Sequence, residues 1–157
     1  MESREFRNAL ARYPTGVTVV VTRDGDGRLV GLTANSVMPI TTSPARLAWS
    51  LGAGSRSRAA FEHATYFAVN VLSEAQVDIA RQLAAPLPDR FMGLSYSESG
   101  CGRLPKFDGC VAWYGCRRSD VLELGDHIMF IGDVVECDEQ EGTPLLFFAG
   151  RFAQLLD

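Results

Sequence analysis

The sequence predicts a mostly β, antiparallel fold, a closed barrel with two or three short helices attached. Three observations indicate this class: about seven segments rich in β-branched and aromatic residues, glycine and aspartate turns between them, and only brief stretches of helical periodicity. A closed barrel is favoured because closure leaves no unpaired edge strand. The length of 157 residues fits one domain, spanning residues 1–157, with a buried core.

The N-terminal half should contain one helix and three strands. The helix begins at a capping Ser3, ends at Pro14 and has one apolar face, formed by Phe6, Leu10 and Tyr13. β-Branched residues and turn signals predict strands at 16–22, 28–36 and 45–51. The segment between the last two strands is expected to be a loop, because Pro39 and Pro44 lie at its ends.

The C-terminal half should contain two helices, four strands and one long loop. Helical patterns predict helices at 58–64 and 73–85, and the other apolar segments predict strands at 66–72, 110–124, 127–138 and 145–154. Residues 85–109 are expected to be a loop, because they combine prolines and glycines with little periodicity. A loop of that length in a compact domain is usually functional or mobile.

Composition and charge exclude several classes of function. A net charge of −4 and a pI near 5.2 disfavour binding to nucleic acid or to a membrane surface, because both need concentrated positive charge. No apolar run approaches the roughly 18–20 residues of a membrane-spanning helix. The charged residues 1–5 lack the apolar segment of a secretory signal, so a cytoplasmic location is expected.

The cysteines and histidines do not define a site. The cysteine spacings match no zinc pattern, so no metal is expected. The four cysteines should be reduced and buried: Cys101, Cys110, Cys116 and Cys137. His63 is expected to be solvated or capping, on a short helix. His127 begins an apolar strand, where one histidine alone indicates a core or turn position.

Hydroxyl-rich segments carry a stronger signal. The segment Thr33-Ala34-Asn35-Ser36 closes one expected strand, and Ser50 lies near the end of another. The segment Ser55-Arg56-Ser57-Arg58 begins a helix, where hydroxyl, backbone N–H and guanidinium groups are suited to phosphate. Ordinary loop and capping serines explain the pattern equally well. The sequence contains neither the glycine pattern of a βαβ dinucleotide fold nor a P-loop.

Five segments resemble the flavin reductase-like family, the small NAD(P)H:flavin oxidoreductases that accompany two-component monooxygenases. They are residues 14–20 (PTGVTVV), 31–36 (GLTANS), 67–72 (FAVNVL), 125–134 (GDHIMFIGDV) and 144–152 (PLLFFAGRF). Each is weak alone, but five in order along nearly the whole chain are specific. The resemblance implies a homodimeric split β-barrel, a Greek-key antiparallel barrel of the FMN-binding type, with flavin near the subunit interface.

The resemblance also implies roles by position. The residues implied at the flavin ring and ribityl chain are Thr33, Ala34, Asn35 and Ser36. Those implied at its phosphates are Ser50, Ser55, Arg56 and Ser57. The pair that touches the flavin from the long loop is Arg90 and Phe91. His127 is implied to orient the nicotinamide of NADH beside Arg151 and Phe152, and no residue is expected to be an essential acid or base.

The chain departs from the family in two places. Phe147, Phe148 and Phe152 stand where many relatives have tyrosine, which removes hydroxyls from the implied nucleotide site. The segment Pro86-Leu87-Pro88 differs from the commoner pattern beside Arg90 and Phe91. These positions bear on the choice between NADH and NADPH and on the flavin contact from the long loop.

The expected function is an NADH-dependent flavin reductase that supplies diffusible reduced FAD or FMN, with FAD favoured, to a partner monooxygenase. Hydride transfer between nucleotides needs orientation and exclusion of water rather than an acid–base cluster, which fits this sequence. Two alternatives stay open: a split-barrel flavoprotein oxidase that keeps its flavin, and a non-catalytic flavin-binding module. A purely structural dimer is disfavoured by the number of matching segments.

Overall fold

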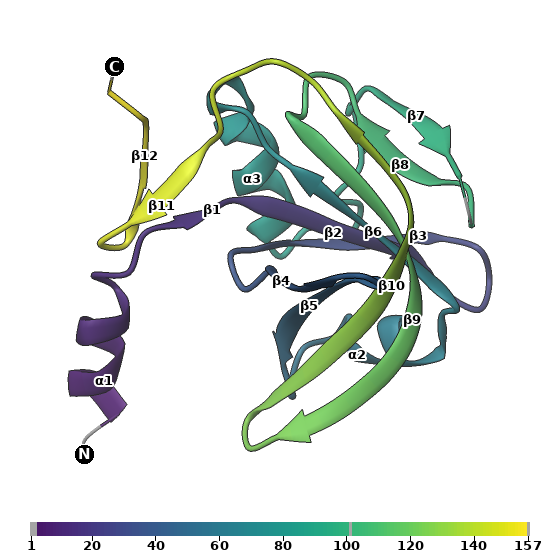
Figure 1. Ribbon diagram of the computed structural model, residues 1–157, viewed down its shortest axis with the longest axis horizontal. Helices are drawn as coiled ribbons and strands as arrows, with labels where there is room; N and C mark the ends of the chain where they lie inside the picture. Colours follow the sequence, from purple (N-terminus) through teal and green to yellow (C-terminus); the bar gives the residue numbers. More distant parts are fainter. Residues whose placement is uncertain (1–2, 101, 157) are drawn as a thin grey trace.

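The computed structural model describes residues 3–100 and 102–156 and has a mostly β, antiparallel architecture (Figure 1). The helices are α1 (Ser3–Leu10), α2 (Arg58–His63) and α3 (Val77–Ala84), the last preceded by a 3-10 turn at Glu74–Gln76. The strands are β1 (Thr15–Gly16), β2 (Thr18–Arg23), β3 (Leu29–Ala34), β4 (Met38–Thr42), β5 (Ala45–Gly52), β6 (Tyr66–Val71), β7 (Tyr96–Ser99), β8 (Leu104–Phe107), β9 (Ala112–Leu124), β10 (His127–Glu139), β11 (Leu146–Phe148) and β12 (Arg151–Ala153).

Seven strands form one antiparallel sheet in the order β3-β2-β6-β9-β10-β5-β4. Its two edge strands are neighbours in the chain, since β3 ends at Ala34 and β4 begins at Met38. Four residue steps span at most about 15 Å, so the sheet must curl until its edges approach each other. No hydrogen-bonded pairing between the described strands joins β3 to β4. The closure expected from the sequence is therefore absent here, and only the chain joins the two edges.

The hairpin β9–β10 is the longest part of this sheet, with thirteen residues in each strand. Two register shifts, between Ile131 and Gly132 and between Val134 and Glu136, interrupt its pairing and bend it. The bend needs glycine, because a Cβ at position 132 would lie 2.6 Å from Cζ of Phe67. Its curvature carries β10 round to pair with β5.

An aromatic cluster links the strands β5, β6 and β10 with α2. Trp49, Phe61, Phe67 and Phe130 are all buried in it. Trp49 stacks on Phe130 with ring centroids 5.0 Å apart and meets Phe61 edge-on at 4.7 Å. Full burial of a large apolar side chain contributes roughly 1.5–3 kcal/mol. This cluster therefore contributes strongly to holding the curled sheet together.

A second cluster covers the other face of β2 and β6. Leu83 of α3 and Phe107 of β8 pack there. Because both faces of β2 are covered, residues 18–22 are all buried and show no alternation. Asn70 of β6 donates from Nδ2 to the carbonyl of Pro105 at 3.1 Å and accepts the backbone N–H of Phe107 at 2.9 Å. These bonds hold the β7–β8 hairpin against the sheet.

Three segments differ from the expectation, and the remaining helices and strands are confirmed with ends shifted by a few residues. The expected loop with two prolines contains β4, where Pro39 is tolerated because the strand is an edge. The expected loop at 85–109 contains β7 and β8, which pair with each other. The single strand expected at 145–154 is two strands, because Ala149 and Gly150 both adopt positive φ and turn the chain.

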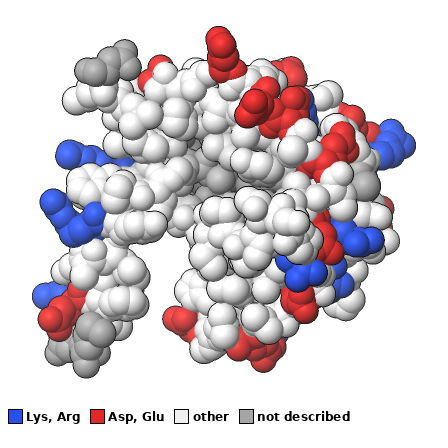
Figure 2. Space-filling model, viewed as in Figure 1, with Lys and Arg blue, Asp and Glu red and all other residues white. Residues whose placement is uncertain are grey.

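Residues 3–16 and 146–153, which we call the arm, comprise α1 and a separate sheet of order β1-β11-β12 (Figure 1). None of the eight residues of α1 is buried, and Phe6 and Leu10 are about half exposed. Figure 2 shows an open gap between the helical end of the arm and the rest of the molecule. The predicted N-terminal helix is therefore confirmed, but its apolar face is uncovered in the single chain.

The cysteines only partly follow the expectation. Cys110 and Cys116 are buried, whereas Cys137 is exposed, and Cys101 lies outside the described residues. The expectation of buried thiols is wrong for Cys137 because the second half of β10 extends past the core into solvent. Burial raises the pKa of the Cys116 thiol to about 12.

The helices within residues 3–100 and 102–156 are short. None of them is long and apolar enough to span a membrane. The longest of them, α1 and α3, have eight residues each.

Candidate functional site

Two depressions lie at opposite ends of β3. The larger, of about 910 Å³, is lined by Arg23, residues 27–31, 54–57 and 86–91, and Tyr96; we call it the arginine cleft. The smaller, of about 530 Å³, is lined mainly by Thr18, Asn35, Val37, Leu47, Tyr114 and Val134; we call it the central pocket. Leu29, Val30 and Gly31 of β3 thus line the arginine cleft, and Asn35, directly after β3, lines the central pocket.

Three segments far apart in the sequence build the arginine cleft: the β2–β3 hairpin, the loop between β5 and α2, and the segment that follows α3. It brings together five of the residues that the family resemblance assigned to flavin: Ser55, Arg56, Ser57, Arg90 and Phe91. Three of the four implied phosphate residues and the implied contact from the long loop therefore share one depression, whereas Ser50 is not among the lining residues of either depression.

Positive charge dominates the lining of this cleft. Its arginines are Arg23, Arg28, Arg56 and Arg90, and the one acid in its lining is Asp89. Glu98 neutralises Arg23 through an ion pair of 2.6 Å. Arg28 and Arg56 have no ion pair or side-chain hydrogen bond to any residue within 3–100 and 102–156. Two unneutralised guanidinium groups make the cleft suited to an anionic ligand such as phosphate.

Arg90 and Phe91 attach the segment after α3 to β3. Arg90 donates from Nε to the carbonyl of Ala85 at 2.8 Å and from Nη1 to the carbonyl of Gly31 at 3.1 Å. A Cβ at Gly31 would lie 2.7 Å from Cζ of Phe91 and 2.9 Å from a methyl of Val21. Only glycine allows this close contact, so Gly31 and Phe91 together set the wall of the cleft.

The helix that follows the implied phosphate residues contributes less than predicted. α2 has only six residues, and Ser57 forms no side-chain capping hydrogen bond. Ser57 is buried, and its backbone N–H donates to Oγ of Ser55 at 3.2 Å. Because so short a helix adds little dipole, the attraction of this region for phosphate rests on its guanidinium and hydroxyl groups.

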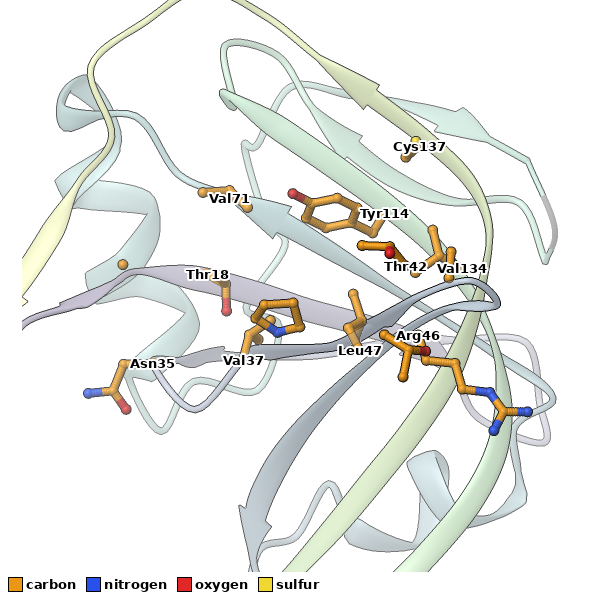
Figure 3. Close-up of a pocket in the computed structure, with 14 residues that line it drawn as sticks. Thr18, Asn35, Val37, Thr42, Arg46, Leu47, Val71, Tyr114, Val134 and Cys137 are labelled. Carbon is orange, nitrogen blue, oxygen red and sulfur yellow. The ribbon is translucent and has the colours of Figure 1, made fainter.

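The central pocket is predominantly apolar. Figure 3 shows Val37, Leu47, Val71 and Tyr114 around a common space, with the guanidinium group of Arg46 directed away from it. Arg46 instead forms an ion pair of 2.7 Å with Asp133, the residue opposite it on β10. An apolar hollow with a few polar groups is typical of a site for a small molecule or cofactor.

The predicted segment at residues 33–36 uses most of its side chains for the fold. Oγ1 of Thr33 donates to the carbonyl of Ala80 at 2.6 Å, and Ala34 is buried. Oγ of Ser36 donates to the carbonyl of Ser50 at 2.9 Å and accepts its N–H at 3.0 Å. Asn35 is exposed and lines the central pocket, so it is the side chain of this segment best placed to meet a ligand.

β3 itself offers a second kind of contact. It is an edge strand that pairs with β2 on one side and with none of the described strands on the other. An edge strand presents backbone N–H and C=O groups that are free to bind a ligand. β3 therefore connects the arginine cleft to the central pocket through a row of backbone groups.

The residues implied for NADH lie apart in the single chain. His127 begins β10 at the tip of the β9–β10 hairpin, whereas Arg151 and Phe152 belong to β12 in the arm (Figure 1). Nδ1 of His127 lies 2.8 Å from Oδ1 of Asp126, and this hydrogen bond lowers the pKa of the Asp126 carboxyl below its ordinary value. The structure does not bring these residues into one site.

The site also contains residues that sequence reasoning missed. Arg23 and Arg28 enter the cleft from the two sides of the Asp24–Gly27 turn, and Tyr114 enters the central pocket from β9. Basic residues on both sides of a hairpin turn were the available signal for the cleft, whereas nothing local marked Tyr114. No group of three His, Cys, Asp or Glu within residues 3–100 and 102–156 could hold a metal ion.

Comparison with known proteins identifies the family. Residues 10–156 match the flavin reductase like domain. The chain belongs to this family. The match to the flavin reductase like domain includes both depressions, β3 and the arm from Leu10 onward.

Its relatives in the flavin reductase like family include the FMN reductase (NADH) SmoA of Agrobacterium fabrum, 35% identical over 97% of this chain and 86% of that protein. The reductase component of the flavin-dependent trigonelline monooxygenase of Acinetobacter baylyi is 40% identical over 95% of this chain and 48% of that protein. The Streptomyces globisporus NADH:FAD oxidoreductase SgcE6, solved in complex with NAD and FAD fragments, matches with a TM-score of 0.93 and 28% identity, over 99% of this chain and 93% of that one.

Some family members are much longer than this chain. It spans 57% and 48% of the lengths of two curated relatives from Rhizobium meliloti. The curled sheet, the two depressions and the arm therefore correspond to about half of those proteins.

Proposed function

We propose that this chain transfers a hydride from NADH to a flavin and that the reduced flavin passes to a separate monooxygenase. The observation that carries the proposal is an arginine cleft and an apolar pocket at the two ends of one edge strand. A flavin nucleotide combines a flat ring system with anionic phosphate, so it needs both kinds of surface. The names of the relatives, an FMN reductase (NADH) and a monooxygenase reductase component, support the same activity.

The described residues fit a flavin. The groups proposed to hold its phosphates are Ser50, Ser55, Arg56 and Ser57. The groups proposed at its ring and ribityl chain are the backbone of Thr33, Ala34 and Ser36, the Asn35 side chain, Arg90 and Phe91. When bound, the flavin supplies the hydride-accepting ring, and the chain supplies orientation and exclusion of water. FAD is proposed over FMN because a cleft of about 910 Å³ has room beyond one phosphate.

NADH is proposed to bind at His127, with Arg151 and Phe152 completing the site. Since these residues lie apart in one chain, we propose that two subunits form the nucleotide site between them. His127 would orient the nicotinamide rather than act as a base, because its exposed ring is already paired with Asp126.

A homodimer is the proposed assembly, built on the curled sheet, which we propose corresponds to a split barrel. All five residues of β4 are exposed, including Met38 and Ile40, and α1 exposes Phe6 and Leu10. On the face shown in Figure 2, charged side chains lie around the periphery and the centre is uncharged. Exposed apolar side chains such as these are typical of a contact between proteins. We propose that this dimer acts in the cytoplasm.

The deciding experiment measures NADH oxidation by the purified protein without flavin, with FMN and with FAD, and repeats each assay with NADPH. Turnover that saturates with free flavin is the expected result, with NADH and FAD the preferred pair. The His127→Ala variant should show a moderate loss of turnover, with Glu5→Gln as a surface control.

Other outcomes would point elsewhere. Flavin that stays bound through purification and turns over without added flavin would favour the oxidase. Flavin binding with no response to either nicotinamide nucleotide would favour a binding module. An absence of both binding and turnover would contradict the proposal.

A further inference from the structure

We propose that Arg28 and Arg56, which line the arginine cleft from two different segments of the chain, bind the two phosphates of FAD, so that Arg28 sets the preference for FAD over FMN. This inference rests on the proposed function, because it assumes that the cleft receives the phosphate end of a flavin. It adds a specificity residue that lies outside the segments implied by the family resemblance.

The backbone at Arg28 is held in place by the turn before it. Oδ1 of Asp24 accepts the backbone N–H groups of Asp26 and Arg28, both at 2.9 Å. Nη1 of Arg23 donates to the carbonyl of Gly27 at 2.8 Å. The Asp24 carboxylate is therefore bonded to backbone amides, and the guanidinium group of Arg28 is left for a ligand.

Arg56 lines the cleft from the β5–α2 loop and differs from its neighbour Arg58. Arg58 pairs with Glu62 at 2.9 Å and with Glu123 at 2.6 Å, so its charge is neutralised. Arg56 has no such partner within residues 3–100 and 102–156, and it lines the cleft beside Ser55. Arg58 is therefore held by ion pairs with two glutamates, whereas Arg56 lines the cleft.

The other charged groups of the cleft are already engaged. Arg23 is paired with Glu98, and Arg90 donates to two backbone carbonyls. The acid Asp89 accepts the backbone N–H of Phe91 at 2.9 Å. The cleft therefore presents two free guanidinium groups, one on the β2–β3 hairpin and one on the β5–α2 loop.

This arrangement distinguishes a pyrophosphate from a single phosphate. FMN ends in one phosphate, which the serines and Arg56 of the β5–α2 loop can hold. FAD continues through a second phosphate to adenosine, and that phosphate would reach Arg28 on the β2–β3 hairpin. A guanidinium group binds phosphate through two parallel hydrogen bonds, which a lysine cannot reproduce.

The test compares the dissociation constants of FAD and FMN, measured by flavin fluorescence during titration of the whole chain. The Arg28→Ala variant should weaken FAD binding about tenfold, as expected for loss of a charged hydrogen bond, and change FMN binding less than about twofold. Arg28→Lys should lose part of the FAD affinity. Arg56→Ala should weaken both flavins, and Arg4→Ala, which removes one charge from α1, should weaken neither.

The outcomes separate this inference from the proposed function. Equal losses for FAD and FMN in Arg28→Ala, or no loss for either, would overturn the role of Arg28 while leaving the reductase in place. A higher KM for NADH with an unchanged FAD dissociation constant would assign the arginines to NADH instead and also overturn it. Failure of the unaltered chain to bind either flavin would overturn the proposed function. An unchanged thermal midpoint in Arg28→Ala verifies that the exposed substitution leaves the fold intact.

Discussion

The curled sheet and helix α1 of the arm use the same kinds of apolar residue in opposite ways, whereas Phe147 and Phe152 of the arm pack against the core. In the sheet, Phe67 and Phe130 are 2% and 0% exposed. In the arm, Phe6 and Leu10 of α1 are 49% and 52% exposed. The sheet therefore completes its core within one chain, whereas the apolar face of α1 needs another surface to cover it.

The curled sheet and the arm also differ in the length of their strands and helices, and therefore in the stability that each can have alone. β9 and β10 pair over thirteen residues each, whereas β11 and β12 have three residues each and α1 has eight. Isolated helices shorter than roughly 12–15 residues are marginal in water. The contrast indicates that the sheet is stabilised by contacts within the chain, whereas α1 has no buried residue in the single chain.

The largest effect is expected from truncating the aromatic cluster of the sheet. Phe130→Ala removes a fully buried ring that stacks on Trp49 at 5.0 Å. We expect a loss of about 3–5 kcal/mol in the free energy of unfolding, measured by urea titration, because the cavity cannot collapse between strands. Tyr13→Ala in the exposed N-terminal segment is the control and should cost less than about 1 kcal/mol. Similar losses of unfolding free energy in Phe130→Ala and Tyr13→Ala would contradict the contrast between a buried sheet core and an exposed N-terminal segment.

The next effect tests what covers the arm. Leu10→Asp places a charge on the apolar face of α1, so it should separate the subunits without unfolding the sheet. Light scattering after size exclusion should show the mass falling from twice the chain mass to the 17.1 kDa of one chain. Glu5→Gln on the same helix should leave the mass unchanged. A dimer that survives Leu10→Asp would show that another surface covers its interface.

A smaller, pH-dependent effect is expected from the ion pair between β5 and β10. The hydrogen bond from Arg46 lowers the pKa of the Asp133 carboxyl. A lowered folded-state pKa means that the carboxylate stabilises the fold above its unfolded pKa of about 3.9, and that this contribution is lost as the pH falls through the folded value.

Asp133→Asn should therefore lower the thermal midpoint at pH 7, and the difference from the unaltered chain should shrink at pH 3. Asp126→Asn provides a matched comparison, because that carboxyl also has a lowered pKa but its side chain is 97% exposed. Its effect should be smaller, since solvent screens an exposed pair. A loss for Asp133→Asn that persists unchanged at pH 3 would contradict the assignment.

The smallest effect is a difference in alkylation rate between two thiols, those of Cys116 and Cys137, and its measurement needs no substitution. Burial raises the pKa of Cys116 to about 12, so this thiol stays protonated at pH 8 and should resist alkylation in the folded protein. Cys137 is exposed and should react with iodoacetamide under the same conditions. Mass spectrometry of peptides after labelling measures both. Labelling of Cys116 at the rate of Cys137 would show that the curled sheet opens easily.

Local patterns were sufficient to predict most of the strands and the helices. The β-branched run at residues 18–22 and the apolar run at residues 128–131 identify strands wherever they lie in the fold. β4 and the β7–β8 hairpin escaped detection, because prolines and glycines there weaken the local strand signal while pairing with the adjacent strand of a hairpin stabilises each strand. The split of the last strand was missed because Ala149 adopts a positive φ, and an alanine in the sequence does not indicate such a conformation.

The five family segments identified the family, and they also pointed to Ser55, Arg56, Ser57, Arg90 and Phe91, which the structure places in one cleft. Local sequence could not show that Arg28 and Arg56 line the same cleft or that Asn35 lines a different depression. Nor could it show that the hydroxyl groups of Thr33 and Ser36 form hydrogen bonds within the fold. Those facts depend on how the sheet curls. Curling is set by contacts between residues far apart in the chain, such as Phe67 against Gly132, and the sheet edges that it leaves unpaired determine where a ligand can bind.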